Sequence, residues 1–381
     1  MQHVANEGVE SSDLVSRSRF IYKISMIKKY NKVIASETGD ILYIPDTYLG
    51  HKLSSNTKTH FFRKYSGEYY FTDQYGWRVG SNDDKTNLKN IDYFICGCST
   101  VLGTGVEYKD TIGHLLSKKL NKTIANLGVG NYSDIQILRQ IDISSKKKNP
   151  KLVIMILEDL IGRSFKQLNT DIVHRPFFKK NKKTKKFELF ESNPIPFFLY
   201  KRFINLKKKS QVKNLNLINK LEASLLFLCF QFLNNRVKNF LLRLIGLNNY
   251  EYVSSKDKDA RLFILKLISK KINQLVEKYN YNFFIFPVYP YMFEKKRIKL
   301  FYKEVELLSK LISKESNSDK IFFNKSKDLE KAHGNFFKKN NIKMGEFIDT
   351  LLWSDNNHPT PKGTKIYADC IYKSLIKFKL I

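Results

Sequence analysis

Four residues in three separate segments of this chain have the types and spacing that nucleophilic catalysis requires. Ser99 follows the apolar segment 91–98 and precedes a glycine-rich turn, a position at the end of a buried strand where open parallel sheets place their sites. Gly128 ends a second apolar segment, and without a Cβ its N–H could approach an oxyanion closely. Asp355 and His358 stand three residues apart, a spacing that lets the carboxylate bind Nδ1–H and leaves Nε2 free as a base.

The residues after His358 predict a loop that holds the imidazole out from the core. Pro359 restricts the histidine to extended conformations, while Thr360 and Pro361 suit the cap and first position of a final helix. That helix has an apolar stripe facing inward, formed by Ile366, Cys370, Ile371, Leu375 and Phe378.

Alternating apolar and amphipathic segments predict a parallel sheet wound with helices. The expected strands are 91–98, 123–129, 151–157 and 281–288. Asp110 is the expected cap of a helix to residue 120, and Ser133 with Gln136 forms the capping box of the next helix. The predicted fold class is α/β, a three-layer α/β/α sandwich with a mainly parallel sheet, a small N-terminal β appendage and a helical insertion.

The remaining segments predict the domain organisation. Residues 1–90 form a lead-in with a hairpin around Ser66-Gly67, residues 91–160 and 258–381 form the core, and residues 161–257 form a basic insertion. The insertion contains a largely apolar helical stretch beside several lysines. We interpret it as a helical lid or subdomain, with a helix lying on an anionic membrane surface as the alternative.

The chain carries 67 Lys+Arg against 36 Asp+Glu, a formal charge of +31. Clustered lysines suggest nucleic acid or anionic membranes as partners, but Lys, Asn, Ile, Phe and Tyr are over-used together, as an A/T-rich coding sequence produces. Because no recognition motif accompanies the charge, no specific nucleic-acid partner is expected. Peripheral contact with an anionic membrane remains an alternative.

Cysteine and histidine spacing argues against a metal or disulfide framework. The four cysteines at 96, 98, 229 and 370 form no CxxC pair, and the seven histidines show no zinc-ligand spacing. No cofactor is expected. Neither a signal peptide nor a transmembrane run of about 18 to 20 apolar residues is recognisable, so we expect a cytoplasmic protein.

The three segments, in this order, resemble the SGNH (GDSL-type) hydrolases, α/β proteins that hydrolyse esters with a serine nucleophile. The resemblance covers residues 91–160 and 350–381, and more weakly 281–288. It implies that Ser99 is the nucleophile and that its N–H and that of Gly128 form the oxyanion hole. It further implies that Asp355 and His358 complete a Ser-His-Asp triad.

Two positions depart from the family pattern. Cys98 stands where the family has Asp, and we interpret it as a small buried residue, with a reactive thiol as the alternative. Glu158-Asp159 replaces the Asn-Asp of the third block, which removes an oxyanion donor typically worth about 2.7 to 4 kcal/mol. Glu158 must therefore be protonated, turned away or neutralised, and Arg163 could pair with either carboxylate.

The sequence therefore predicts a serine-dependent ester hydrolase, an esterase or deacylase. The resemblance to bacterial members with envelope or polysaccharide functions implies an O-acyl ester of a carbohydrate or lipid as substrate. The first alternative is a catalytically weakened binding protein, or an acyltransferase, linked to surface-polysaccharide metabolism. The second is a peripheral membrane protein acting through residues 177–245.

Overall fold

The computed structural model describes most of the chain apart from the N-terminal and central segments. The described residues are 42–63, 66–81, 90–158, 161–165, 175–191, 250–251, 253–254, 257–288, 295–315, 319–324, 328–340, 351 and 358–381. Asp159 and Asp355 lie outside these ranges, as does the apolar stretch of the insertion.

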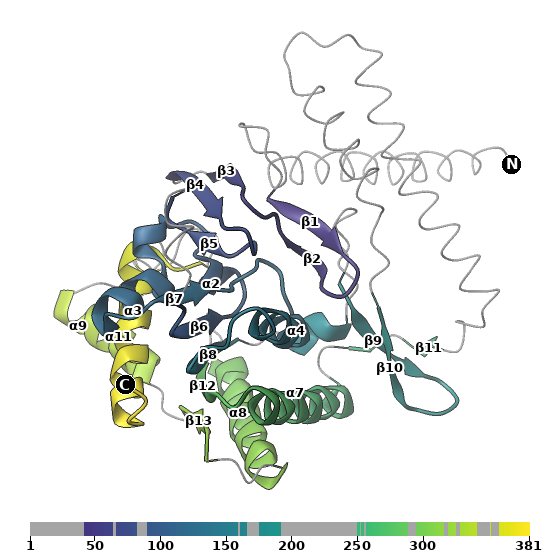
Figure 1. Cartoon of the computed structure of the whole chain (residues 1–381). Helices are drawn as coiled ribbons and strands as arrows, with labels where there is room; N and C mark the ends of the chain where they lie inside the picture. Colours follow the sequence, from purple (N-terminus) through teal and green to yellow (C-terminus); the bar gives the residue numbers. More distant parts are fainter. Residues whose placement is uncertain are drawn as a thin grey trace, which may run out of the picture.

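Eight strands of the described chain form one mixed sheet in the order β13-β12-β8-β6-β7-β5-β4-β3 (Figure 1). In chain order they are β3 (Lys58–Arg63), β4 (Ser66–Thr72), β5 (Arg78–Val79), β6 (Tyr93–Cys96), β7 (Ile124–Asn126), β8 (Leu152–Leu157), β12 (Asn282–Pro287) and β13 (Ile321–Phe323). The five from β13 to β7 are parallel. The four strands expected from apolar runs are therefore confirmed, each beginning one or two residues later than the run that predicted it and ending zero to three residues earlier.

Helices cover both faces of this sheet, which confirms the three-layer α/β/α architecture (Figure 1). They are α2 (Ser99–Leu102), α3 (Ile112–Leu120), α4 (Asp134–Ser145), α7 (Lys258–Tyr279), α8 (Lys295–Glu315), α9 (Asp328–Asn340) and α11 (Pro361–Lys377), with 3-10 turns η2 (Tyr108–Asp110) and η3 (Ile161–Phe165). Alternate residues of β8 face opposite cores: Met155 packs with α4, α7 and α8, whereas Ile154 packs with α3, α9 and α11.

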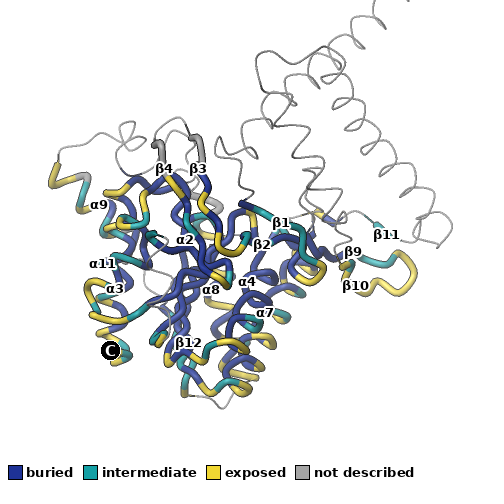
Figure 2. Tube along the Cα trace, turned by 45° about the horizontal axis from the view of Figure 1, so that its top comes forward, coloured by how far each residue is buried: buried dark blue, intermediate teal, exposed yellow. Residues whose placement is uncertain are grey.

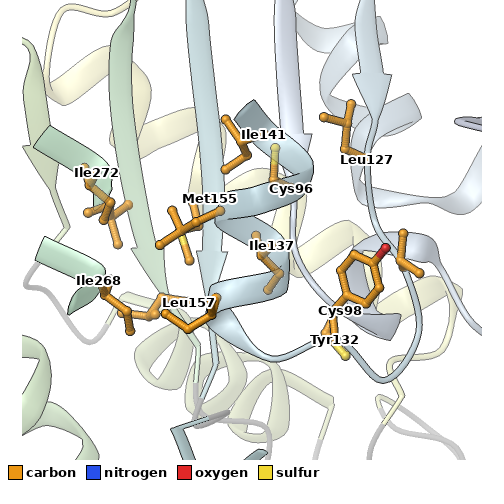
Figure 3. Packing of buried hydrophobic residues seen from close by; sticks show 14 of the residues in the cluster. Cys96, Cys98, Leu127, Tyr132, Ile137, Ile141, Met155, Leu157, Ile268 and Ile272 are labelled. Carbon is orange, nitrogen blue, oxygen red and sulfur yellow. The ribbon is translucent and has the colours of Figure 1, made fainter. Parts of the chain in front are cut away.

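Buried apolar residues line both faces of the sheet. Figure 2 shows the buried part of the trace running through the sheet, with the exposed positions on the outer helices. Figure 3 shows one such face, where Ile137 and Ile141 of α4 and Ile268 and Ile272 of α7 surround Met155. The capping box of Ser133 and Gln136 that opens α4 is present. At α3 the expected cap is wrong by one residue, because the Thr111 hydroxyl rather than Asp110 accepts from the helix.

The N-terminal hairpin extends the core sheet instead of standing apart from it. Strands β3 and β4 pair antiparallel as expected, but β4 also pairs with β5, and Arg78 of β5 pairs with Asn126 of β7. Residues 58–79 therefore lie in the same sheet as the core, and the expected appendage is an antiparallel extension. A separate two-stranded ribbon, β1 (Tyr43–Asp46) with β2 (Gly50–Leu53), precedes it.

Apart from the 3-10 turn η3, the regular structure in the described part of the insertion is β and not the expected helix. Strands β9 (Phe177–Asn181), β10 (Phe187–Phe190) and β11 (Tyr250–Glu251) form a small antiparallel sheet. The predicted helical stretch falls outside the described residues. Among the helices that are described, none combines the length and apolar composition needed to cross a bilayer.

Candidate active site

Ser99 lies at the point where the strand order reverses. It is the first residue of α2, three residues beyond the end of β6, and β6 is flanked by β7 on one side and β8 on the other. Chain connections leave such a strand toward opposite faces of the sheet, which opens a crevice at its carboxyl end. The serine is partly exposed, whereas Cys98 and Thr100 on either side of it are buried.

The lead-in segment clamps the short helix that carries Ser99. Arg78 of β5 donates to the carbonyl oxygens of Leu102, Gly103 and Val106, and its guanidinium stacks 4.0 Å from the ring centroid of Tyr70. The carbonyls of Leu102 and Gly103 end α2, where helix acceptors have no intrahelical partner, and that of Val106 belongs to the turn that follows. The segment 72–78 thus fixes the helix that carries Ser99 through Arg78, a role that the sequence analysis did not assign.

The C-terminal loop brings His358 to the serine. The Nε2 atom of His358 lies 2.8 Å from Ser99 Oγ, although the two residues are 259 positions apart. Thr360 caps α11 by accepting from Gly363 N–H, and its own N–H donates to Leu351 O at 3.0 Å. The predicted cap and the predicted first-turn proline are confirmed, so the histidine extends from a loop fixed at its exit.

Gly128 does not hold the position expected of an oxyanion donor. Its N–H donates to Asn126 Oδ1 at 2.9 Å, while Asn126 Nδ2 donates to Val101 O at 2.7 Å. A Cβ on Gly128 would lie 2.2 Å from Leu102 N. The glycine is needed because α2 packs directly against this loop, and its amide is already used within the protein, so the oxyanion assignment for Gly128 is wrong.

Glu158 follows β8 and is only 5% exposed. Burial raises the pKa of its carboxyl, and this effect outweighs attraction to Arg163, a hydrogen bond with the Thr100 side chain and attraction to His358. Its Oε1 has no hydrogen-bond partner among the described residues. The carboxyl therefore lies near Thr100 and His358, and its burial shifts its protonation toward the neutral form relative to an exposed glutamate.

Arg163 contacts the turn that carries Ser99. Its Nη1 lies 2.7 Å from Cys98 Sγ and donates to Tyr132 O at 2.9 Å. Attraction to Arg163 lowers the pKa of Glu158, but the predicted ion pair is not formed between these two described side chains, and pairing with Asp159 concerns a residue outside the described ranges. Sequence spacing alone could not place a guanidinium beside Cys98, because η3 reaches that turn only through the tertiary fold.

A second buried guanidinium, Arg175, adjoins the first. Its Nη1 donates to Arg163 O at 3.4 Å, and burial followed by repulsion from Arg163 lowers its pKa to about 10, although Cys98 opposes this. The sequence analysis did not single it out, since it stands in an ordinary polar stretch just before β9.

No protein-family model matches this chain, and no curated protein matches its sequence. Solved structures of similar shape include the psychrotrophic esterase EstA from Pseudoalteromonas sp., at 11% identity over 77% of this chain and 100% of that chain, with a TM-score of 0.37. TesA is 9% identical over 75% of this chain and 99% of its own, with a TM-score of 0.38. A protein described as lipolytic and of the G-D-S-L family, from Desulfitobacterium hafniense, is 11% identical over 74% and 99%, with a TM-score of 0.29.

Proposed function

We propose that this chain is a serine ester hydrolase of the SGNH type, with Ser99 as nucleophile and His358 as general base. The observation that carries the proposal is the 2.8 Å contact between His358 Nε2 and Ser99 Oγ. That distance is within the range required for proton transfer from a hydroxyl to an imidazole. Both groups come from fixed elements, the start of α2 and the loop leading into α11.

The reaction would proceed through an acyl-enzyme. His358 Nε2 takes the Ser99 hydroxyl proton while Oγ attacks the ester carbonyl, and the resulting imidazolium returns the proton to the departing alkoxide. Water, deprotonated by the same nitrogen, then attacks the acyl carbon, and the proton passes to Ser99 Oγ as the acid leaves. On its sequence spacing, we assign Asp355 the role of orienting Nδ1–H and stabilising the imidazolium.

The oxyanion would be stabilised without the Gly128 amide. Ser99 N–H is the first amide of α2, and the first amides of a helix have no intrahelical acceptor. We assign the second donor to Glu158 in its neutral form, with the hydroxyl proton on Oε1. A carboxylic acid can replace an amide as donor only while protonated, which the raised pKa of Glu158 favours.

The proposed substrate is an O-acyl ester of a carbohydrate or lipid, on the basis of the sequence resemblance. The competing proposal is a binding protein on the same fold that has lost turnover through the Glu158 replacement, and a transferase is the third. Release of acid from a simple ester in water supports the hydrolase. Ligand binding without any turnover in the intact protein would support the binding protein instead.

The direct test compares the wild-type protein with Ser99→Ala on 4-nitrophenyl acetate. We expect Ser99→Ala to lose at least about 10³-fold in kcat, since nucleophile removal leaves only binding and oxyanion stabilisation. Ser117→Ala, which changes a serine of α3 away from the site, is the matched control and should retain full activity. A fluorophosphonate probe should label Ser99 and no other serine. Equal rates for Ser99→Ala and wild type would end the proposal.

A further inference from the structure

Arg175 differs from the other buried arginines of the described chain in having no adequate partner. Arg139 forms two bonds to the Glu191 carboxylate, and Arg261 likewise binds both oxygens of Glu304. Arg78 donates to three carbonyl oxygens. Each of these three guanidinium groups therefore has its charge or its donors satisfied inside the protein.

Arg175 is 3% exposed, yet its described contacts do not compensate its charge. One long bond, 3.4 Å, joins Nη1 to Arg163 O, and its Nε–H has no partner among the described residues. No described carboxylate lies within ion-pair distance of its guanidinium. The nearest charged group identified is Arg163, which carries the same sign and reduces the pKa of Arg175.

Burying a cation without a counter-ion costs several kcal/mol, and such uncompensated groups concentrate at functional sites. Arg175 lies beside the proposed catalytic residues, because Arg163 contacts Cys98 and Cys98 precedes Ser99. The surroundings of the nucleophile therefore hold a positive charge that the described protein does not neutralise. A guanidinium with free donors suits the planar, two-oxygen geometry of a carboxylate.

We propose that Arg175, backed by Arg163, receives a negatively charged oxygen group of the substrate, so that the ester cleaved at Ser99 carries a carboxylate-like anion near its scissile bond. This inference rests on the proposed esterase function and narrows its substrate class to anionic esters. The substrate charge would supply the counter-ion that Arg175 lacks in the free protein.

The test uses two matched pairs of esters that differ only in charge. The pair 4-acetoxybenzoate and methyl 4-acetoxybenzoate places the charge on the leaving group, and the pair mono-4-nitrophenyl succinate and 4-nitrophenyl butyrate places it on the acyl group. We expect wild-type KM to be about 10- to 100-fold lower for the anion of at least one pair, the effect of one or two charge-assisted hydrogen bonds. The pair that responds identifies the side of the ester that carries the charge.

The decisive variant is Arg175→Met, which keeps the apolar stem and removes the charge. It should abolish the preference for the anion while leaving kcat/KM for the neutral ester within about threefold. Because it removes an uncompensated buried charge, it should also raise the midpoint of thermal unfolding. Arg139→Met, which leaves Glu191 unpaired, is the matched control and should lower that midpoint without altering the charge preference.

Binding to a Ser99→Ala background separates this inference from the proposed function. Calorimetric titration with uncleaved 4-acetoxybenzoate should show tighter binding than with its methyl ester, and Arg175→Met should remove the difference. Equal affinities of the two probes, or a preference that survives Arg175→Met, would overturn the role of Arg175 even if the protein is an active esterase. A wild-type protein that binds the anion through Arg175 but cleaves no ester would overturn the function alone.

Discussion

Glu158→Gln is the substitution that most directly tests how this site stabilises an oxyanion. Glutamine has nearly the same shape, keeps a hydrogen-bond donor and cannot ionise. Glu158 is buried, its pKa is raised mainly by desolvation, and its carboxyl bonds to Thr100, the neighbour of Ser99. The carboxyl is therefore close enough to the reacting oxygen for its charge to matter.

The magnitude follows from the charge on the carboxyl. Two negative charges about 4 Å apart repel by about 4 kcal/mol at an effective dielectric constant of 20, which corresponds to about 10³-fold in rate. Wild-type kcat/KM should therefore fall as pH rises through the raised pKa of Glu158. Glu158→Gln should lack this alkaline fall and exceed wild type at the alkaline end by up to about 10³-fold.

The assay is a pH-stat measurement of ester hydrolysis for wild type, Glu158→Gln and Glu158→Leu. Leucine removes both charge and donor, so Glu158→Leu should lose about 10²- to 10³-fold in kcat at every pH. If Glu158→Gln is as inactive as Glu158→Leu throughout, Glu158 acts as a carboxylate, and the donor role is refuted. An unchanged alkaline limb in Glu158→Gln would equally refute it.

Stability gives a second readout of the same group. The folded state binds the Glu158 proton more tightly than the unfolded state, because burial raises the pKa of this carboxyl above its ordinary value of 4.5. The contribution to stability is therefore fully present below about pH 4.5 and is lost as pH rises through the folded pKa. Glu158→Gln should remove this loss, measured as a urea midpoint that no longer declines over that interval.

Two further substitutions test the scaffold. Arg78→Met should destabilise the protein by about 3 kcal/mol or more, because three buried carbonyls lose a charged donor. The variant should also have a lower kcat. A variant with the urea midpoint and the kcat of the wild type would contradict the proposed clamp on α2. Burial lowers the pKa of His333 from 6.5 to about 4, so the unfolded state binds this proton first as pH falls. Stability should therefore drop by up to about 3 kcal/mol between pH 6.5 and pH 4, and His333→Leu should remove that part of the drop in urea titrations; an identical drop in both proteins would exclude His333 as its cause.

The local chemistry of the sequence predicted much of the framework. Apolar runs with no polar face predicted the strands that became β6, β7, β8 and β12, because a strand covered on both sides has no place for charge. Capping chemistry predicted the starts of α4 and α11, since hydroxyl oxygens satisfy the first helix amides locally. The position of Ser99 between a buried strand and a glycine-rich turn, and the Asp-x-x-His spacing, made Ser99 and His358 candidates.

Only the tertiary structure decided which of these groups meet. The 2.8 Å contact of His358 with Ser99 spans 259 positions, and the clamp of Arg78 on α2 joins a strand of the lead-in to the nucleophile's turn. The same packing assigned the Gly128 amide to Asn126 and buried Arg175 where no described residue supplies a counter-ion. The spacing of residues in the sequence predicts contacts only within a turn or a helix. Whether a charge is buried, and which acceptor an amide binds, depends on which distant segments the sheet brings together.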